Sequence, residues 1–143
     1  MITLPENDRR EIHEVKQKSP VELAFIGDAV YELLVREYIS LRHDVPAGKL
    51  HAMCVQFVRA EAQQHALEIL QSELTEEETD LVRRGRNANK VMAPKHSDPA
   101  AYRAATGLET LFGYLYLTGR EDRIRTLFAR IAEGSEAAGG ETV

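Results

Sequence analysis

Residues 23–39 read LAFIGDAVYELLVREYI. At about 100° per residue this stretch forms a helix with one apolar stripe, made of Leu23, Ile26, Val30, Leu33 and Leu34. The opposite side is also apolar, and it carries Val21, Phe25, Val35 and Ile39. A helix with two apolar sides is either central to a bundle or part of a subunit contact. Asp28 and Glu32 are set among the apolar residues, so we expect Asp28 to be at least partly buried.

The remainder of the chain has the same helical character. Alternating Val, Ile and Thr runs are absent, while Ala, Leu, Glu, Arg and Gln recur at helical spacing, which predicts an all-α domain. Capping boxes at Ser19 to Glu22 and Thr75 to Glu78, together with Pro46 and Asp98-Pro99, mark helix starts. We expect helices over residues 5–17, 20–41, 46–71, 99–117 and 120–133, and a further one that begins after Thr75.

Length and composition restrict the possible functions. The 143 residues suffice for one domain but not for a catalytic domain with a separate binding module, so we expect a domain over residues 1–133 and a disordered tail over 134–143. The single cysteine, Cys54, and the lack of a long apolar run favour a cytoplasmic protein without a membrane partner. A net charge of −5 argues against a protein that coats nucleic acid with its whole surface, but it allows a local basic patch.

A second acid raises the same question as Asp28. Glu109 is the only acid between Asp98 and Glu121. Its helical face is otherwise small, apolar or aromatic, with Tyr102, Ala105, Thr106, Phe112, Gly113 and Tyr116. Each of the two acids either meets an arginine or a backbone group, or both converge on a hard cation such as Mg²⁺, which prefers oxygen ligands and keeps several waters.

Residues 81–97, LVRRGRNANKVMAPKHS, hold five basic residues and no acid. Gly85, the Asn87 and Asn89 pair and Pro94 predict a loop. Arginine and asparagine suit contacts to phosphates and 2′-hydroxyls of RNA, although a solvated loop that maintains solubility has the same composition. The candidate RNA-binding residues are Arg83, Arg84, Arg86, Asn87, Lys90 and Lys95.

Other chemistries lack the residues they need. The five histidines show no pair at helical ligand spacing, and Cys54 has no partner for a zinc site. Neither a P-loop nor a dinucleotide glycine motif occurs, so no nucleotide cofactor is expected. Ser19 or Cys54 as a nucleophile would need a base that nothing in the sequence places nearby.

The segments that carry the two acids resemble the ribonuclease III family. Residues 23–39 are similar to the family's signature helix, E-F-L-G-D-A-V-L-E, and residues 106–117, TGLETLFGYLYL, are similar to its D-x-x-E-A-L-x-G-A-L-Y-L helix. The intervening RRGRNAN and the segment from PKHSD to Tyr102 resemble mini-ribonuclease III, a bacterial subgroup that consists of the catalytic domain alone. The resemblance extends over nearly everything from Ser19 to Arg130.

The resemblance implies an all-α ribonuclease III fold and a two-fold homodimer formed partly through the signature helix, with Phe25 at the dimer contact. It also implies that both strands of double-stranded RNA are cleaved with Mg²⁺, for which Mn²⁺ can substitute. Asp28 and Glu109 match the family's catalytic and metal-binding acids. The substrate suggested by the resemblance is the precursor of the large (23S) ribosomal RNA.

Three positions depart from the family pattern, since Ala24, Thr106 and Ala47 stand where acids are usual. Mini-ribonucleases III resemble the chain in these losses, which leave open whether one or two ions bind. Glu32, one turn beyond Asp28, is expected to pair with an arginine rather than to orient a ligand water. Two other functions fit the same residues, a non-catalytic RNA-binding module of ribosome assembly and a purely structural helical dimer.

Overall fold

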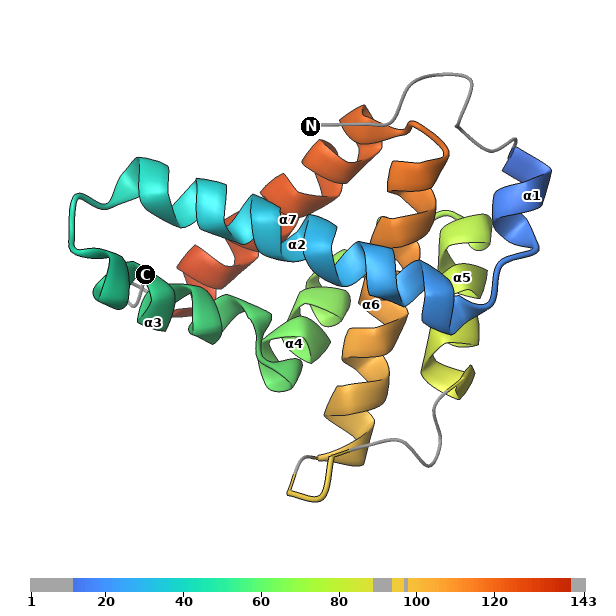
Figure 1. Cartoon of the computed structure of the whole chain (residues 1–143), viewed down its shortest axis with the longest axis horizontal. Helices are drawn as coiled ribbons and strands as arrows, with labels where there is room; N and C mark the ends of the chain where they lie inside the picture. Colours follow the sequence, from blue (N-terminus) through green and yellow to red (C-terminus); the bar gives the residue numbers. More distant parts are fainter. Residues whose placement is uncertain (1–11, 89–93, 97, 140–143) are drawn as a thin grey trace.

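A computed structural model of the chain shows α-helices joined by short connecting segments (Figure 1). The structure describes residues 12–88, 94–96 and 98–139, and these contain no β-strand. In chain order the helices are α1 Ile12–Lys16, α2 Pro20–Arg42, α3 Ala47–Val58, α4 Ala60–Leu70, α5 Glu76–Ala88, α6 Pro99–Leu117 and α7 Glu121–Gly139. The all-α prediction is confirmed. Among the described residues, no helix is both long and apolar enough to cross a membrane.

Three helices begin at the caps that the sequence predicts. The Ser19 hydroxyl accepts the backbone N–H of Glu22 while the Glu22 carboxylate accepts that of Ser19, each at 3.2 Å. Thr75 and Glu78 make the same reciprocal pair at the start of α5, and the Asp98 carboxylate accepts a backbone N–H in the first turn of α6. These bonds satisfy donors that the first turn of a helix leaves unpaired.

Helix α6 is the centre of the fold, because α2, α4 and α5 all pack on it. Its side chains Leu108, Leu111 and Phe112 are completely buried. The ring of Tyr31 on α2 meets Phe112 of α6 and Phe128 of α7 edge to face, with centroids 5.4 and 5.9 Å apart. The aromatic contacts therefore join three helices around one buried ring.

Two glycines allow the backbones of α2 and α6 to touch where they cross. A Cβ at Gly27 would lie 1.7 Å from the carbonyl oxygen of Glu109, and a Cβ at Gly113 would lie 1.9 Å from that of Leu23. No other residue fits at such distances, because the atoms it would meet belong to the backbone of the neighbouring helix. Asp28 directly follows Gly27, so the contact also fixes the position of the Asp28 backbone relative to α6.

Gly85 lies at another close crossing, between α5 and α6. A Cβ there would lie 2.5 Å from the hydroxyl oxygen of Thr110 and 2.7 Å from the Cα of Gly107. Gly85 is therefore a packing residue inside a helix, and the prediction of a loop is wrong for residues 81–88. Residues 89–93 and 97 of the predicted loop lie outside the described part of the chain.

The single helix expected over residues 46–71 is two helices, α3 and α4. Arg59 interrupts it with an extended backbone, at φ −63° and ψ 155°. The side-chain amide of Gln63 donates to the carbonyl oxygen of Val58 at 2.9 Å and so satisfies an acceptor at the end of α3. The sequence holds neither proline nor glycine at this point, so nothing in the local pattern indicates the break.

The C-terminal end of the described chain also differs from expectation. The last helix, predicted to end near Glu133, continues to Gly139, and Gly134 packs so closely on Ile69 of α4 that a Cβ would lie 2.6 Å from its Cδ1. This contact extends α7 along α4. Residues 140–143 of the expected tail and residues 1–11 of the first expected helix lie outside the described residues.

Helix α2 is rotated relative to the predicted stripes. Val35 and Ile39, assigned to the second face, are completely buried, whereas Leu33, assigned to the core, is 53% exposed. The exposed apolar residues Val21, Phe25 and Leu33 form what we call the outer face of α2. Helical periodicity alone does not show which side of α2 is buried, because apolar residues occupy most of the circumference of this helix.

The α2–α6 crossing yields the first prediction. Gly27→Ala should destabilise the chain by about 3 kcal/mol, because the added methyl meets a backbone carbonyl that cannot move without separating the helices. Denaturant unfolding followed by circular dichroism measures this loss. Gly48→Ala on α3 is the matched control, since a Cβ there meets nothing within 4 Å, and it should be neutral or stabilise by up to about 1 kcal/mol. Equal effects of the two substitutions would contradict the crossing.

Candidate active site

The crossing of α2 and α6 brings the two candidate acids together. Asp28 follows Gly27 on α2, and Glu109 on α6 is the residue whose carbonyl oxygen faces Gly27. The Asp28 carboxyl lies close enough to Glu109 for its negative charge to help raise the pKa of that acid. Two acids that lie 81 positions apart in the sequence thus form one pair through a contact between two backbones.

The members of this pair have different environments. Asp28 is exposed in the single chain, so the expectation of partial burial is wrong for it. The reason is the rotation of α2, which turns Asp28 toward the same side as the exposed Phe25. Glu109 is half-buried among the residues of α6. The site therefore has one carboxyl in solvent and one at the edge of the core.

The pKa of Glu109 is raised to about 7, mainly because burial disfavours the charged carboxylate and partly because the charge of Asp28 is nearby, while a hydrogen bond from Gln63 opposes the rise. An acid of this kind is only partly ionised at neutral pH. A cation bound next to it favours the ionised form, because opposite charge stabilises the carboxylate. The pair is thus electrostatically suited to a positively charged ligand.

Gln63 on α4 is a site residue that the sequence analysis missed. Its side chain is 3% exposed, and its amide nitrogen donates to Glu109 Oε2 at 3.2 Å and to the carbonyl oxygen of Val58 at 2.9 Å. The sequence could have indicated this role, since Gln63 shares the buried face of α4 with Ala66, Leu67 and Leu70. A polar residue on an otherwise apolar helix face needs a partner.

Glu32 does not join the pair. Its carboxylate accepts two hydrogen bonds from the guanidinium of Arg36, at 3.1 and 2.7 Å. The expected pairing of Glu32 with an arginine is confirmed, and both side chains are on the solvent side of α2.

The three positions where acids are usual in the family supply no further ligand. Ala24 is buried, and Ala47 lies exposed in the first turn of α3. The hydroxyl of Thr106 donates to the carbonyl of Tyr102 at 3.1 Å. Within residues 12–88, 94–96 and 98–139, no group of three or more His, Cys, Asp or Glu could hold a metal ion. The described donors are therefore the two carboxylates.

The candidate RNA-binding residues are arranged along and beyond the C-terminal half of α5. Arg83 pairs with Asp80, Arg84 is half-buried, and Arg86 and Asn87 are exposed. Lys95 is exposed in the segment before α6. Lys90 lies outside the described residues. The basic side chains thus start from a helix that packs on α6, the helix that carries Glu109.

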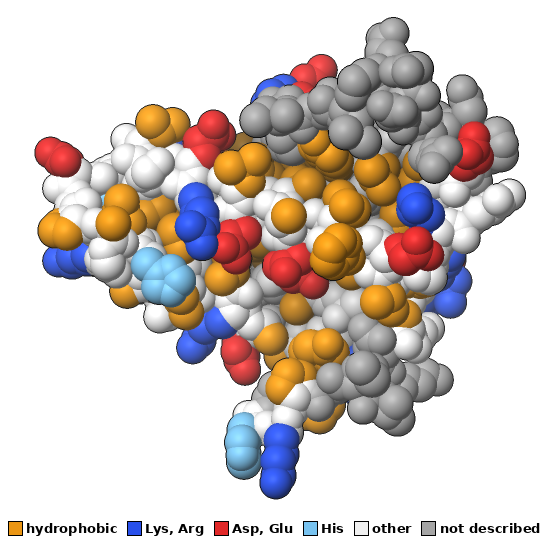
Figure 2. Space-filling view, viewed as in Figure 1, with side chains coloured by type: hydrophobic (Ala, Val, Ile, Leu, Met, Phe, Trp, Pro, Cys, Tyr) orange, Lys and Arg blue, Asp and Glu red, His pale blue; other side chains and the backbone are white. Residues whose placement is uncertain are grey.

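The outer face of α2 borders the acid pair. Phe25 is 78% exposed, and with Ile26, Ala29 and Leu33 it lines a shallow hollow that also includes Asp28, Glu32 and Arg36. Hydrophobic and acidic side chains lie next to each other on the face that α2 crosses in Figure 1 (Figure 2). Exposed apolar patches next to functional groups often mark interaction surfaces.

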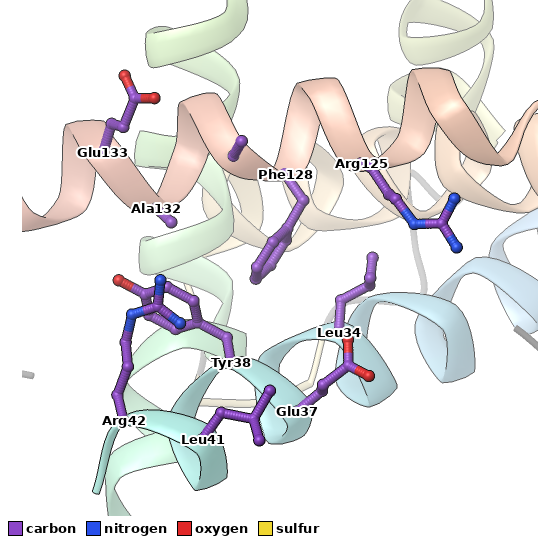
Figure 3. Close-up of a pocket in the computed structure, with 10 residues that line it drawn as sticks. Leu34, Glu37, Tyr38, Leu41, Arg42, Arg125, Phe128, Ala132 and Glu133 are labelled. Carbon is purple, nitrogen blue, oxygen red and sulfur yellow. The ribbon is translucent and has the colours of Figure 1, made fainter.

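A second hollow of about 350 Å³ lies between the C-terminal half of α2 and α7 (Figure 3). Leu34, Leu41 and Phe128 contribute its apolar wall. Its acids, Glu37 and Glu133, lie at opposite ends in Figure 3, so they do not form a pair like that of Asp28 and Glu109. The candidate catalytic acids therefore lie at the α2–α6 crossing and not in this hollow.

Comparisons with known proteins agree with this geometry. A family model described as the ribonuclease III domain matches residues 21–120. A mini-ribonuclease 3 of Symbiobacterium thermophilum is 46% identical over 114 residues, which cover 80% of this chain and 88% of that protein. The mini-ribonuclease 3 of Staphylococcus aureus is 37% identical over 126 residues, which cover 87% of this chain and 94% of that one.

A solved structure shows the same fold. The crystal structure of a protein from Fusobacterium nucleatum matches with a TM-score of 0.76 at 28% identity, and the match covers 85% of this chain and 98% of that one. The resemblance carried by residues 23–39 and 106–117 is therefore confirmed. The chain belongs to the ribonuclease III family, in its mini-ribonuclease III group.

Proposed function

We propose that this chain is an endoribonuclease that cleaves double-stranded RNA with a divalent cation held between Asp28 and Glu109. The single observation that carries the proposal is the pairing of an exposed carboxyl with a desolvated one at the α2–α6 crossing. Membership of the ribonuclease III family supports it. The cation is Mg²⁺, with Mn²⁺ as a substitute, because the donors are carboxylate oxygens.

Two carboxylates suffice for such an ion, because Mg²⁺ keeps several waters and takes further oxygens from substrate phosphates. When bound, the cation supplies an activated water and stabilises charge on the phosphate. Asp28 faces solvent and would meet the incoming ion and RNA first. Glu109 would hold the ion from the protein side, and the positive charge would favour the ionised form of a carboxyl whose pKa is raised by burial.

The outer face of α2 supports a homodimer. Its exposed residues Phe25 and Leu33 line the hollow that includes Asp28, and a second copy would remove this apolar surface, together with the exposed Val21, from water. A two-fold pair presents two acid sites on one assembly, as cleavage of both strands of a duplex requires. Phe25 is the proposed central contact because it is the most exposed of the three.

The RNA path runs over the basic side chains of α5 and the segment that leads into α6. Arg86, Asn87 and Lys95 are exposed, and they are suited to phosphates and 2′-hydroxyls rather than base edges. We infer from the family resemblance that the physiological substrate is precursor 23S ribosomal RNA. A non-catalytic RNA-binding role is the alternative, and it predicts binding of duplex RNA without cleavage in the presence of Mg²⁺.

The metal site leads to a prediction about cleavage. Asp28→Asn and Glu109→Gln should each slow cleavage of long duplex RNA by on the order of a thousandfold, because each change removes a charged oxygen ligand at nearly constant volume. Gel assays with Mg²⁺ and with a chelator measure the rates. Glu37→Gln, an exposed acid elsewhere on α2, is the control and should cleave normally. Near-normal rates for either site variant would refute the assignment.

The outer face predicts the oligomeric state. The chain should be a dimer at micromolar concentration, and Phe25→Glu should give a monomer, because a charge would be placed in the centre of an apolar contact. Sedimentation or light scattering distinguishes the two states. Leu41→Glu is the matched control, since Leu41 is 77% exposed on the same helix but borders the hollow against α7. A monomeric wild type, or dissociation by both changes, would contradict this surface.

The basic residues predict a salt effect. Arg86→Gln together with Lys95→Gln should weaken duplex binding and flatten the plot of log affinity against log salt by about 1 for each phosphate that the protein no longer neutralises. Binding is measured in chelator so that no RNA is cut. Arg130→Gln on α7, an arginine paired with Glu73, should leave the slope unchanged. An unaltered slope in the double variant would place the RNA elsewhere.

A further inference from the structure

Gln63 is an unusual residue for the surface on which it lies. The inner face of α4 is otherwise apolar, with Ala66, Leu67 and Leu70 all buried. A buried amide that lacks hydrogen bonds is costly, and an apolar residue of similar volume would pack there without that penalty. The two donor contacts of Gln63 therefore need an explanation beyond the packing of α4 against α6.

The orientation of the amide follows from its partners. The nitrogen Nε2 lies 3.2 Å from Glu109 Oε2 and 2.9 Å from the carbonyl oxygen of Val58. Both partners are acceptors, so a flipped amide would place its own oxygen against them. The donor is aimed at Glu109, and the Val58 carbonyl at the break between α3 and α4 holds it from the other side.

Two buried oxygen atoms near Glu109 lack a hydrogen-bond partner among the described residues. They are Gln63 Oε1 and the hydroxyl oxygen of Tyr31. The charge of Glu109 contributes to raising the pKa of the Tyr31 phenol, so both groups border this carboxylate. Of these two neighbours, only Gln63 makes a hydrogen bond to it.

We propose that Gln63 is a positioning residue, whose buried amide holds the carboxylate of Glu109 in the orientation in which Glu109 and Asp28 share a cation. This inference rests on the proposed metal site. The bond restrains the carboxylate at Oε2, and the carboxylate would keep lone pairs with which to bind an ion. A hydrogen bond to a carboxylate also favours its charged form, in agreement with the opposition of Gln63 to the raised pKa of Glu109.

A purely structural role for Gln63 makes different predictions. If the amide served only to satisfy the Val58 carbonyl, its loss would weaken the α3–α4 junction without a specific effect on metal binding. Its loss would also destabilise the wild-type chain and a Glu109→Gln chain equally, because the two residues would not be coupled. A positioning role requires coupling between Gln63 and Glu109.

The test is binding of Mn²⁺, followed by loss of the electron paramagnetic resonance signal of the free ion. Gln63→Met, which removes the donor at similar volume, should bind Mn²⁺ on the order of 10- to 100-fold more weakly. Gln64→Met, one residue along α4 and half-buried, should match the wild type.

The possible results distinguish failure of the positioning role of Gln63 from failure of the proposed metal site. Unchanged Mn²⁺ affinity in folded Gln63→Met would overturn the positioning role while the metal site stands. Failure of the wild type to bind Mn²⁺, or normal binding by Glu109→Gln, would overturn the metal site itself. Circular dichroism and unfolding in chelator establish that each variant is folded.

One measurement needs no substitution at Gln63. The side-chain amide NMR signal of Gln63 should shift when Mg²⁺ is added to the chain, because the ion would bind to the carboxylate that accepts the Gln63 hydrogen bond, and this shift should vanish in Glu109→Gln. A Gln63 signal that responds to Mg²⁺ identically in the two chains, or in neither, would overturn the proposal even if Gln63→Met did not fold.

Discussion

The backbone contact between α2 and α6 is the constraint on which the rest of this structure depends. Gly27 and Gly113 let each helix touch a carbonyl of the other, and at this distance a single methyl on either side would separate them. The acid pair exists because of this proximity, since Asp28 follows Gly27 and Glu109 provides the carbonyl that Gly27 meets. The close packing of α2 on α6 and the proximity of Asp28 to Glu109 both depend on these two glycines.

Much of the fold could be predicted from local signals. Ser19, Thr75 and Asp98 act through hydrogen bonds to residues two or three positions away, so the sequence holds all the information needed. These inferences succeed because the physical cause lies within one helical turn. The pairing of Asp28 with Glu109 is only one of two alternatives that the sequence leaves open, because it depends on the crossing of α2 and α6 rather than on either helix alone.

The errors arise where tertiary contacts override local preference. Gly85 is predicted to be a loop residue because glycine is common in loops. It lies inside α5, where a side chain would collide with Thr110 and Gly107 of α6. The break at Arg59 is accompanied by a hydrogen bond from Gln63, a residue of the next helix, and Gly134 continues α7 because it packs on Ile69. In each case the decisive partner belongs to another helix, which no single-segment pattern reveals.

The rotation of α2 connects the acid pair to the outer face. Asp28 and Phe25 belong to one surface, so a second copy placed on Phe25 would also displace water near Asp28. Charges interact more strongly where water is excluded, so repulsion within the acid pair would increase without a cation, and attraction to a cation would increase with one. Dimerisation and metal binding would then be reciprocally linked, since whatever favours one in the presence of the other must favour both. In such a dimer, the second copy seated on Phe25 would change the electrostatic environment of Asp28, which is exposed to solvent in the single chain.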